Sequence, residues 1–427
     1  MKLNTSEDIY RFLDAIPAFQ NTGSAAARFD LERFQKFCEA IGDPQDDFPS
    51  IHVAGTNGKG STCQILGAIY HEGGYKTGLY TSPHLLEYRE RFQVDGKYIT
   101  DEELLIFLNK YSGLVKSFRL TYFELSTAIA FWWFRHKNID LAIIEVGLGG
   151  RLDATNIITP LVSVITNISL DHTDILGEDI RSIAREKAGI IKQGVPVVLG
   201  NVSFGASEEV MAIAKNKKSR IYQTNSMEPT WRNGVCILNI DGSPVEFTTD
   251  LVSPIQVHNV ALAWQVVQVL SDRYPVPGKK LNRGLQKVKS TFTLLGRFEK
   301  LHSELDWYFD GAHNLEAVQN LTKTVANMQS LDRTTLVLSL MKDKINEMMM
   351  AEFQKFKKIY YYTIGSKRAA DAREIEKWLP NTDVVSVDKK QQTLFLKELE
   401  SELVIFAGSF YFYSTVREWV QTIRPNH

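Results

Sequence analysis

The residues best suited to chemistry in this chain lie at positions 51–61, which read IHVAGTNGKGS. The first four predict a short strand, the glycines predict a turn, and the residues after Ser61 predict a helix. Such a turn lets backbone N–H groups converge on an anion at a helix N-terminus, where the helix dipole also favours negative charge. Lys59 would reach the β- and γ-phosphates of a nucleotide, and Ser61 would cap the helix or bind a phosphate-bound Mg²⁺.

This segment departs from the usual phosphate-loop pattern. Only Thr56 and Asn57 separate the two glycines where four residues are usual, and Gly60 stands between Lys59 and the hydroxyl group. An ordinary glycine turn before a helix is the alternative, so the phosphate interpretation needs support from the rest of the chain.

Two further predicted strands lead to groups that could bind a metal ion. Residues 141–144 form a continuous apolar run that is typical of a strand buried on both faces, and Glu145 stands at its carboxyl end before a glycine-rich turn. A buried carboxylate needs a cation or a donor, so we interpret Glu145 as a Mg²⁺ ligand, with a strand-end cap as the alternative. Residues 161–168 predict a strand that leads to Asp171 and His172. Histidine is not the first choice for Mg²⁺, so spacing alone leaves His172 equally open to a structural role.

Bulk composition excludes several classes of protein. Apolar content of 44% with 23% charged residues is typical of a soluble globular protein, and a net charge of −1 gives no electrostatic case for nucleic acid or an anionic membrane. No window approaches 18 apolar residues without charge, and the N-terminus does not resemble a signal peptide. Three scattered cysteines favour a reducing compartment, so we expect a cytoplasmic protein.

Strands and helices alternate along the 427 residues, which predicts an α/β protein with more than one domain. We predict a P-loop ATPase domain with a mostly parallel sheet at residues 1–290. A hinge at 291–296 would lead to a smaller Rossmann-like α/β domain at 297–427. Residues 219–252 predict short β-segments outside the main sheet. In the second domain, Asp310 and His313 lie where a strand runs into a glycine turn and a helix, and Gly408–Ser409 repeats this arrangement; two helix caps are the alternative.

Eight segments, in order along nearly the whole chain, together resemble the Mur ligase superfamily of ATP-dependent amide ligases, and within it the folylpolyglutamate synthase/dihydrofolate synthase family. They are VAGTNGKGST (53–62), GLYTSPHL (78–85), LTYFE (120–124), EVGLGGRLDATN (145–156), LDHTD (170–174), REKAGI (185–190), GRFE (296–299) and DGAHN (310–314).

The resemblance implies roles that spacing could not assign. It implies an ATP site made by Asn57, Gly58, Lys59, Gly60, Ser61, Asn259, Arg297, Asp310 and His313. It implies a Mg²⁺ site made by Ser82, Glu145, His172 and Lys187. It implies an acceptor site made by Thr121, Tyr122, Phe123, Glu124, Leu152, Asp153 and Ala154. Lys187 matches a lysine that CO₂ carbamylates, which makes chemical sense because a carbamate supplies anionic oxygens to Mg²⁺ whereas an ammonium would be repelled. A helical surface lysine is the alternative.

The activity implied by the resemblance is amide formation through an acyl phosphate, with ATP, L-glutamate and either dihydropteroate or a reduced folate as substrates. Lys59, Lys187 and His313 would be the catalytic residues, and we expect a monomer. A non-catalytic module that ATP switches between conformations, or a Mur ligase with another acceptor, are the alternative functions.

Overall fold

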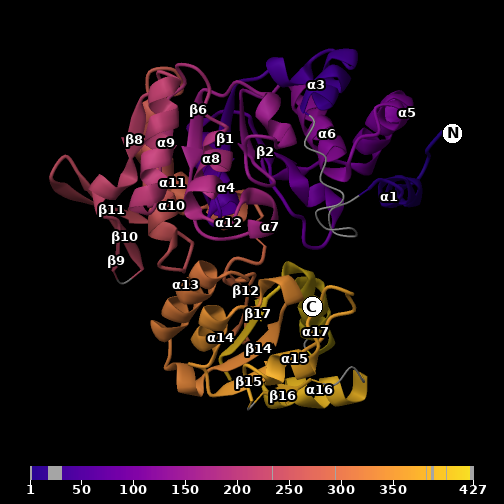
Figure 1. Ribbon diagram of the computed structural model, residues 1–427, viewed down its shortest axis with the longest axis vertical. Helices are drawn as coiled ribbons and strands as arrows, with labels where there is room; N and C mark the ends of the chain where they lie inside the picture. Colours follow the sequence, from indigo (N-terminus) through magenta and orange to yellow (C-terminus); the bar gives the residue numbers. More distant parts are fainter. Residues whose placement is uncertain are drawn as a thin grey trace. The chain divides into compact units, whose positions relative to one another are not determined.

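The computed structural model describes residues 2–17, 31–232, 234–293, 295–380, 382–385, 389–400 and 402–423 (Figure 1). The chain divides into two compact units, one made of residues 1–251 and 256–293 and the other of residues 252–255 and 294–427. Residue 294 of the predicted hinge at 291–296 lies outside the described residues. Both units are α/β, as the sequence predicts.

The first unit is built on an eight-stranded sheet with the order β4-β3-β2-β5-β1-β6-β7-β8. Strand β3 runs antiparallel to both of its neighbours, β2 and β4, and the remaining neighbours are parallel. The strands are β1 (Ser50–Ala54), β2 (Thr77–Tyr80), β3 (Phe92–Val94), β4 (Lys97–Tyr98), β5 (Leu141–Glu145), β6 (Val162–Ile165), β7 (Val197–Leu199) and β8 (Ile221–Gln223).

The central strands β1 and β5 are buried along their whole length, because helices cover both faces of the sheet. Ala142 and Ile144 of β5 join the core of α3, α5 and α6, and Ile165 of β6 joins that of α8 and α9. The helices are α1 (Ser6–Asp14), α3 (Leu31–Ala40), α4 (Lys59–Gly73), α5 (Asp101–Ser117), α6 (Tyr122–Lys137), α7 (Thr173–Leu176), α8 (Ile180–Ala188), α9 (Phe204–Asn216), α10 (Gln256–Val269), α11 (Gly278–Leu285) and α12 (Val288–Thr291).

A separate antiparallel sheet confirms the predicted β-rich excursion. It consists of β9 (Thr230–Arg232), β10 (Val235–Ile240) and β11 (Ser243–Thr248) in the order β11-β10-β9. Asp241 and Gly242 connect β10 to β11, and both adopt positive φ values, 51° and 80°, as a tight hairpin turn requires.

The second unit has a six-stranded sheet with the order β12-β13-β17-β14-β15-β16, in which only β12 runs antiparallel to its neighbour. Its strands are β12 (Glu299–Lys300), β13 (Trp307–Asp310), β14 (Thr335–Ser339), β15 (Lys358–Tyr361), β16 (Asp383–Val384) and β17 (Val404–Gly408). Its helices are α13 (Leu315–Ala326), α14 (Glu347–Phe353), α15 (Ala372–Glu376), α16 (Lys389–Glu398) and α17 (Tyr413–Ile423).

Four elements differ from the sequence-based expectation. Strand β8 extends the main sheet, although we assigned its residues to the excursion. Strand β6 ends at Ile165, earlier than predicted, and helix α14 was not predicted. Helix α11, within residues 275–289, was not predicted either, and it packs tightly on α4.

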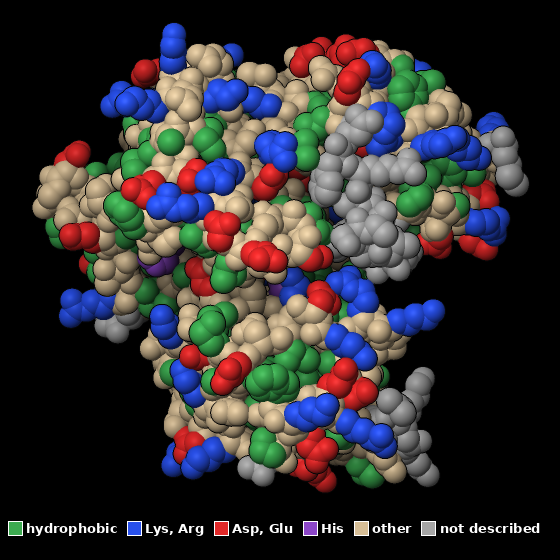
Figure 2. Space-filling model, in the orientation of Figure 1, with side chains coloured by type: hydrophobic (Ala, Val, Ile, Leu, Met, Phe, Trp, Pro, Cys, Tyr) green, Lys and Arg blue, Asp and Glu red, His purple; other side chains and the backbone are tan. Residues whose placement is uncertain are grey.

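Positive and negative side chains are interspersed over the face of the molecule in Figure 2, in keeping with the net charge of −1. Within the described part of the chain, no helix has both the length and the apolar character needed to cross a bilayer.

Helices α11 and α4 approach each other closely at Gly284, because a Cβ atom there would lie 2.6 Å from the Cα atom of Ile69. We predict that Gly284→Ala lowers the free energy of unfolding by about 1–3 kcal/mol, since backbone atoms cannot yield. Gly113→Ala is the matched control: Gly113 is an exposed position in α5 where a Cβ atom meets nothing within 4 Å, so this change should stabilise by about 0.4–1 kcal/mol. Urea denaturation measures both, and equal effects of the two substitutions would contradict the close packing.

Candidate active site

The turn between β1 and α4 has the geometry of an anion-binding loop. Helix α4 begins at Lys59, three residues earlier than predicted, with Gly58 as its N-cap at φ 81°. Lys59, Gly60 and Ser61 therefore form the first helical turn, whose N–H groups have no partner within the helix. A Cβ atom at Gly58 would lie 2.6 Å from Oδ1 of Asn259, so only glycine fits there.

The carboxyl end of β6 fixes the conformation of this loop. The Thr166 hydroxyl donates to the carbonyl oxygen of Asn57 (2.6 Å), and the Asn57 N–H donates to Oδ1 of Asn167 (2.7 Å). Thr166 also lies so near Gly55 that a Cβ atom there would be 1.9 Å from its Oγ1. The loop is thus held before any ligand binds, which is the preorganisation that phosphate binding requires.

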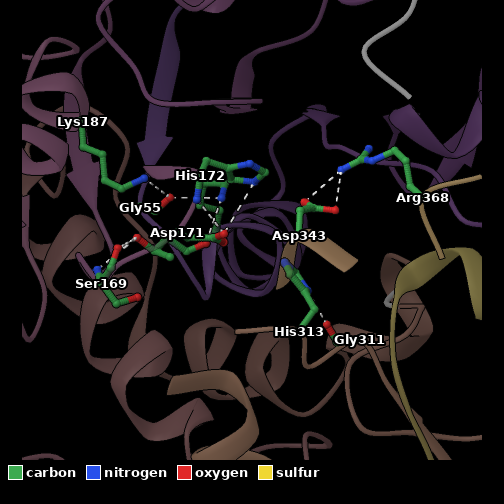
Figure 3. A network of polar contacts seen from close by, with 11 residues as sticks. Gly55, Ser169, Asp171, His172, Lys187, Gly311, His313, Asp343 and Arg368 are labelled. Carbon is green, nitrogen blue, oxygen red and sulfur yellow. Dashed lines mark hydrogen bonds and ion pairs between the residues drawn. The ribbon is translucent and has the colours of Figure 1, made fainter. Parts of the chain in front are cut away.

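Two lysine side chains donate to one carbonyl oxygen of the loop. Lys59 Nζ lies 3.1 Å from the oxygen of Gly55 and 3.1 Å from that of Thr56, and Lys187 Nζ lies 2.8 Å from the oxygen of Gly55 (Figure 3). Lys187 is only 3% exposed. Burial, together with the positive charge of Lys59, lowers the pKa of Lys187 to about 7, and Asp171 opposes this shift. Much of the Lys187 amine is therefore neutral near pH 7.

Glu145 brings a buried carboxylate beside the same loop. It is 2% exposed at the end of β5, and its Oε2 accepts the Ser82 N–H at 2.9 Å. A Cβ atom at Gly60 would lie 3.6 and 3.7 Å from the two carboxylate oxygens. Glu145, Ser82 and the first turn of α4 therefore meet, as a cation beside a phosphate would require.

His172 lies at the start of α7 and contacts Asp171. Its φ of 50° is left-handed, its N–H donates to Asp171 Oδ1 (2.9 Å), and its Nε2 lies 3.9 Å from the same oxygen (Figure 3). Within the described residues, no three His, Cys, Asp or Glu side chains group closely enough to hold a metal ion. A cation here would need other oxygen ligands, such as the Ser82 hydroxyl, phosphate oxygens or a carbamate on Lys187.

The predicted acceptor residues 121–124 form the start of α6. Thr121 and Glu124 make a capping box, in which Glu124 Oε2 accepts the Thr121 N–H at 2.7 Å, and Glu124 Oε1 pairs with Arg33 at 2.5 Å. Both Glu124 oxygens therefore support the fold. Phe123 packs against the glycine turn after β5, since a Cβ atom at Gly147 would lie 2.4 Å from its ring.

Residues 152–154, the other predicted acceptor segment, are held by a chain of buried hydrogen bonds. The chain starts at β1, the strand that precedes the glycine loop. His52, 0% exposed in β1, contacts Thr155 Oγ1 through Nε2 (2.8 Å), and that hydroxyl donates to Asp153 Oδ1 (2.5 Å). Because an ionised carboxylate only accepts, the hydroxyl must accept from His52, which assigns the imidazole proton to Nε2. Burial lowers the pKa of His52 to about 3 and raises that of Asp153.

Arg91 is a candidate that sequence reasoning missed. It is 4% exposed, its Nε donates to His84 Nδ1 (2.8 Å), and its guanidinium lies 5.6 Å from the Tyr122 ring. It has no carboxylate partner within the described residues. Burial and the charge of Arg91 lower the pKa of His84 to about 3. The sequence signal that could have pointed to Arg91 is its place directly before Phe92, where β3 begins. A buried cation without a carboxylate partner among the described residues favours an anionic ligand.

In the second unit, Asp310 ends β13 and His313 lies in the loop that follows it. Asp310 Oδ2 accepts the Phe298 N–H at 2.8 Å, and burial raises the Asp310 pKa to about 6 against the opposing charge of Arg297. His313 Nδ1 contacts the carbonyl oxygen of Gly311 at 2.7 Å (Figure 3), so Nδ1 carries the proton and a neutral ring keeps a lone pair on Nε2.

The helix-cap alternative is also realised in this unit. Asn314 caps α13, and Ser409 caps the 3₁₀ turn η8 (Phe410–Phe412). In the same unit, the Asp343 carboxylate pairs with Arg368 at 3.1 Å (Figure 3).

Comparison with known proteins agrees with this geometry. The family model of the Mur ligase middle domain matches residues 53–267, and that of the Mur ligase glutamate ligase domain matches residues 296–410. The chain therefore belongs to the Mur ligase family.

Two relatives and one solved structure show which members of this family the chain resembles. A folylpolyglutamate synthase of Lacticaseibacillus casei is 30% identical over 97% of this chain and 98% of its own length. A dihydrofolate synthase/folylpolyglutamate synthase of Bacillus subtilis is 32% identical over 91% of this chain and 94% of its own. The structure of a Mycobacterium tuberculosis folylpolyglutamate synthase complexed with ADP is 27% identical, with a TM-score of 0.84, covering 96% of this chain and 97% of that one.

The lowered pKa of Lys187 predicts a pH-dependent stability. The unfolded amine keeps its proton up to its ordinary pKa of 10.5, whereas the folded amine loses it near 7. The cost of burying Lys187 is thus complete below pH 7 and declines as the pH rises towards 10.5. In CO₂-free buffer, Lys187→Met should therefore stabilise the protein most near pH 6.5 and progressively less up to pH 9.5, as followed by urea denaturation.

Lys215→Met, which removes an exposed lysine of α9, is the control and should keep the wild-type pH profile. A stability difference between Lys187→Met and wild type that does not change with pH would contradict the buried, neutral amine.

Proposed function

We propose that this Mur ligase adds L-glutamate to a folate-type acceptor at the expense of ATP. The observation that carries the proposal is the convergence of Lys59, Lys187 and Glu145 on one preorganised glycine loop. The printed activities of the relatives supply the acceptor class, and nothing in the comparisons supports the alternative of a non-catalytic ATP switch.

The proposed reaction has two steps. A carboxylate oxygen of the acceptor attacks the γ-phosphorus of ATP, and ADP leaves with the bridging oxygen. The amine of L-glutamate then attacks the acyl carbon, phosphate leaves, and the ammonium proton passes to a base as the amide forms. In the first step, Lys59 and the N–H groups of the first α4 turn would stabilise the charge on the transferred phosphoryl group.

Ser82, Glu145, His172 and Lys187 are the residues we propose to hold Mg²⁺. The fit rests on the buried Glu145 carboxylate beside Gly60 and on the neutral, buried amine of Lys187, which can react with CO₂ to give an anionic carbamate. When bound, Mg²⁺ would supply positive charge to the phosphate oxygens.

Further residues take the roles that the family resemblance implies. Asn57, Gly58, Gly60, Ser61 and Asn259 would line the nucleotide site of the first unit. Arg297, Asp310 and His313 of the second unit would bind the nucleotide. His313 would also accept the proton of the attacking amine, for which the lone pair on its Nε2 is suited.

The acceptor would bind at the start of α6 and at the loop after β5. Thr121, Tyr122, Phe123, Leu152, Asp153 and Ala154 are its proposed neighbours, whereas Glu124 would act by shaping the helix start. Arg91 would attract the acceptor's carboxylate. Because relatives carry both names, we propose that dihydropteroate and reduced folates are both accepted. A monomeric, cytoplasmic enzyme remains part of this proposal.

Lys59→Ala tests the function directly. We expect phosphate release from ATP to require both a folate acceptor and L-glutamate in the wild type, and kcat to fall at least about hundredfold in the variant. Steady-state phosphate assays measure this, and Lys215→Ala should behave as wild type. Wild-type phosphate release that ignores either substrate, or full activity of Lys59→Ala in a folded protein, would refute the proposal.

Carbamylation of Lys187 has its own test. With ¹³C-bicarbonate we expect a carbamate carbon signal in the NMR spectrum of the wild type that Lys187→Ala lacks. Removing CO₂ should lower turnover, and bicarbonate should restore it in the wild type alone. Full turnover in CO₂-free buffer would show that the unmodified lysine suffices.

A further inference from the structure

One aromatic ring in the second unit contacts both of the segments, 296–299 and 310–314, that carry the proposed site residues of this unit. The ring centroid of Phe410 lies 4.5 Å from the guanidinium carbon of Arg297. It lies 5.6 Å from the ring of His313, edge to face at 63°. A Cβ atom at Gly311 would lie 2.0 Å from Phe410 Cε1, so the glycine between Asp310 and His313 is required by this ring.

Phe410 is not needed to complete the core. Its side chain is only partly buried, whereas Phe412, two residues later, is 0% exposed. Phe412 packs against the rings of Phe309 and Trp419, with distances between ring centroids of 6.3 Å and 5.5 Å. The two phenylalanines of η8 therefore have different roles: Phe412 fills the core, and Phe410 contacts the proposed site residues Arg297 and His313.

We propose that Phe410 is a positioning residue for Arg297 and His313, an inference that rests on the proposed function of those two side chains. The negative face of the ring attracts the guanidinium and restricts a long side chain that otherwise samples many rotamers. The same ring supports the edge of the His313 imidazole, whose Nδ1–H is held by Gly311, and so fixes the direction of Nε2.

The contacts also explain why this arrangement needs Gly311. The Phe410 ring occupies the space where any other residue at 311 would place its Cβ atom, so strand β13 and η8 approach each other only with glycine there. Ring and glycine therefore form one complementary pair, which brings the end of β13 and the beginning of its following loop against the ring.

Phe410→Leu tests the proposal because it removes the π-face and keeps an apolar side chain. We expect kcat to fall, or KM for ATP to rise, about tenfold, while Phe410→Tyr, which keeps the ring, stays within about twofold of wild type. Phe412→Leu is the matched control: it should lower the unfolding midpoint more than Phe410→Leu does, yet leave the kinetics of the folded fraction unchanged.

A second pair of variants keeps the test independent of activity. Gly311→Ala should lower the unfolding midpoint, and Phe410→Ala in the same chain should restore part of it by making room for the new Cβ atom. Wild-type kinetics in Phe410→Leu, or no relief of Gly311→Ala by Phe410→Ala, would overturn the positioning role. A wild-type enzyme without acceptor- and glutamate-dependent phosphate release would instead remove the proposed function itself.

Discussion

The crowding of two lysine amines at the carbonyl oxygen of Gly55 is the constraint on which the rest of the site depends. Burial of the amine is the main cause of the low pKa of Lys187, and the positive charge of Lys59 nearby lowers that pKa further. An anion bound there would relieve the repulsion between the two amines, and in our proposal that anion is a phosphate held by Lys59 or a carbamate formed on Lys187. The buried carboxylate of Glu145 lies beside the same loop, where we propose that Mg²⁺ binds.

The scaffold carries this loop because the strands around it are buried on both faces. Strand β1 lies between β5 and β6, so their carboxyl ends deliver Gly55, Glu145 and Thr166 to the same edge of the sheet. The residues that hold the loop come from segments far apart in the chain. Its shape is therefore a property of the tertiary fold more than of the glycines themselves.

Local patterns were sufficient to predict much of the fold. Alternating and β-branched residues predicted β1, and a continuous apolar run predicted β5. The start of α4 was wrong by three residues because Gly58 in a left-handed cap allows the helix to begin at Lys59, although Gly60 is a poor helix former. Helix α14 and the packing of α11 on α4 depend on tertiary contacts that single-sequence periodicity does not contain.

For the candidate site, strand ends predicted Glu145 beside the loop, and the family resemblance added Ser82 and Lys187. The hydrogen-bond chain from His52 to Asp153, the contact of Arg91 with His84 and the ring of Phe410 could not be predicted. Each depends on contacts between distant segments, and each residue type is common in ordinary cores. Glu124 shows the opposite case, since a residue inside a family motif serves a cap and an ion pair.

The central claim is that the loop transfers the γ-phosphoryl group of ATP to the acceptor's carboxylate. An acceptor labelled with ¹⁸O in that carboxylate tests it most directly, by mass spectrometry of the phosphate released during turnover with L-glutamate. Our account predicts that each phosphate carries one oxygen from the acceptor, with the other label retained in the amide. Phosphate without label, formed at the same rate as the amide, would contradict it.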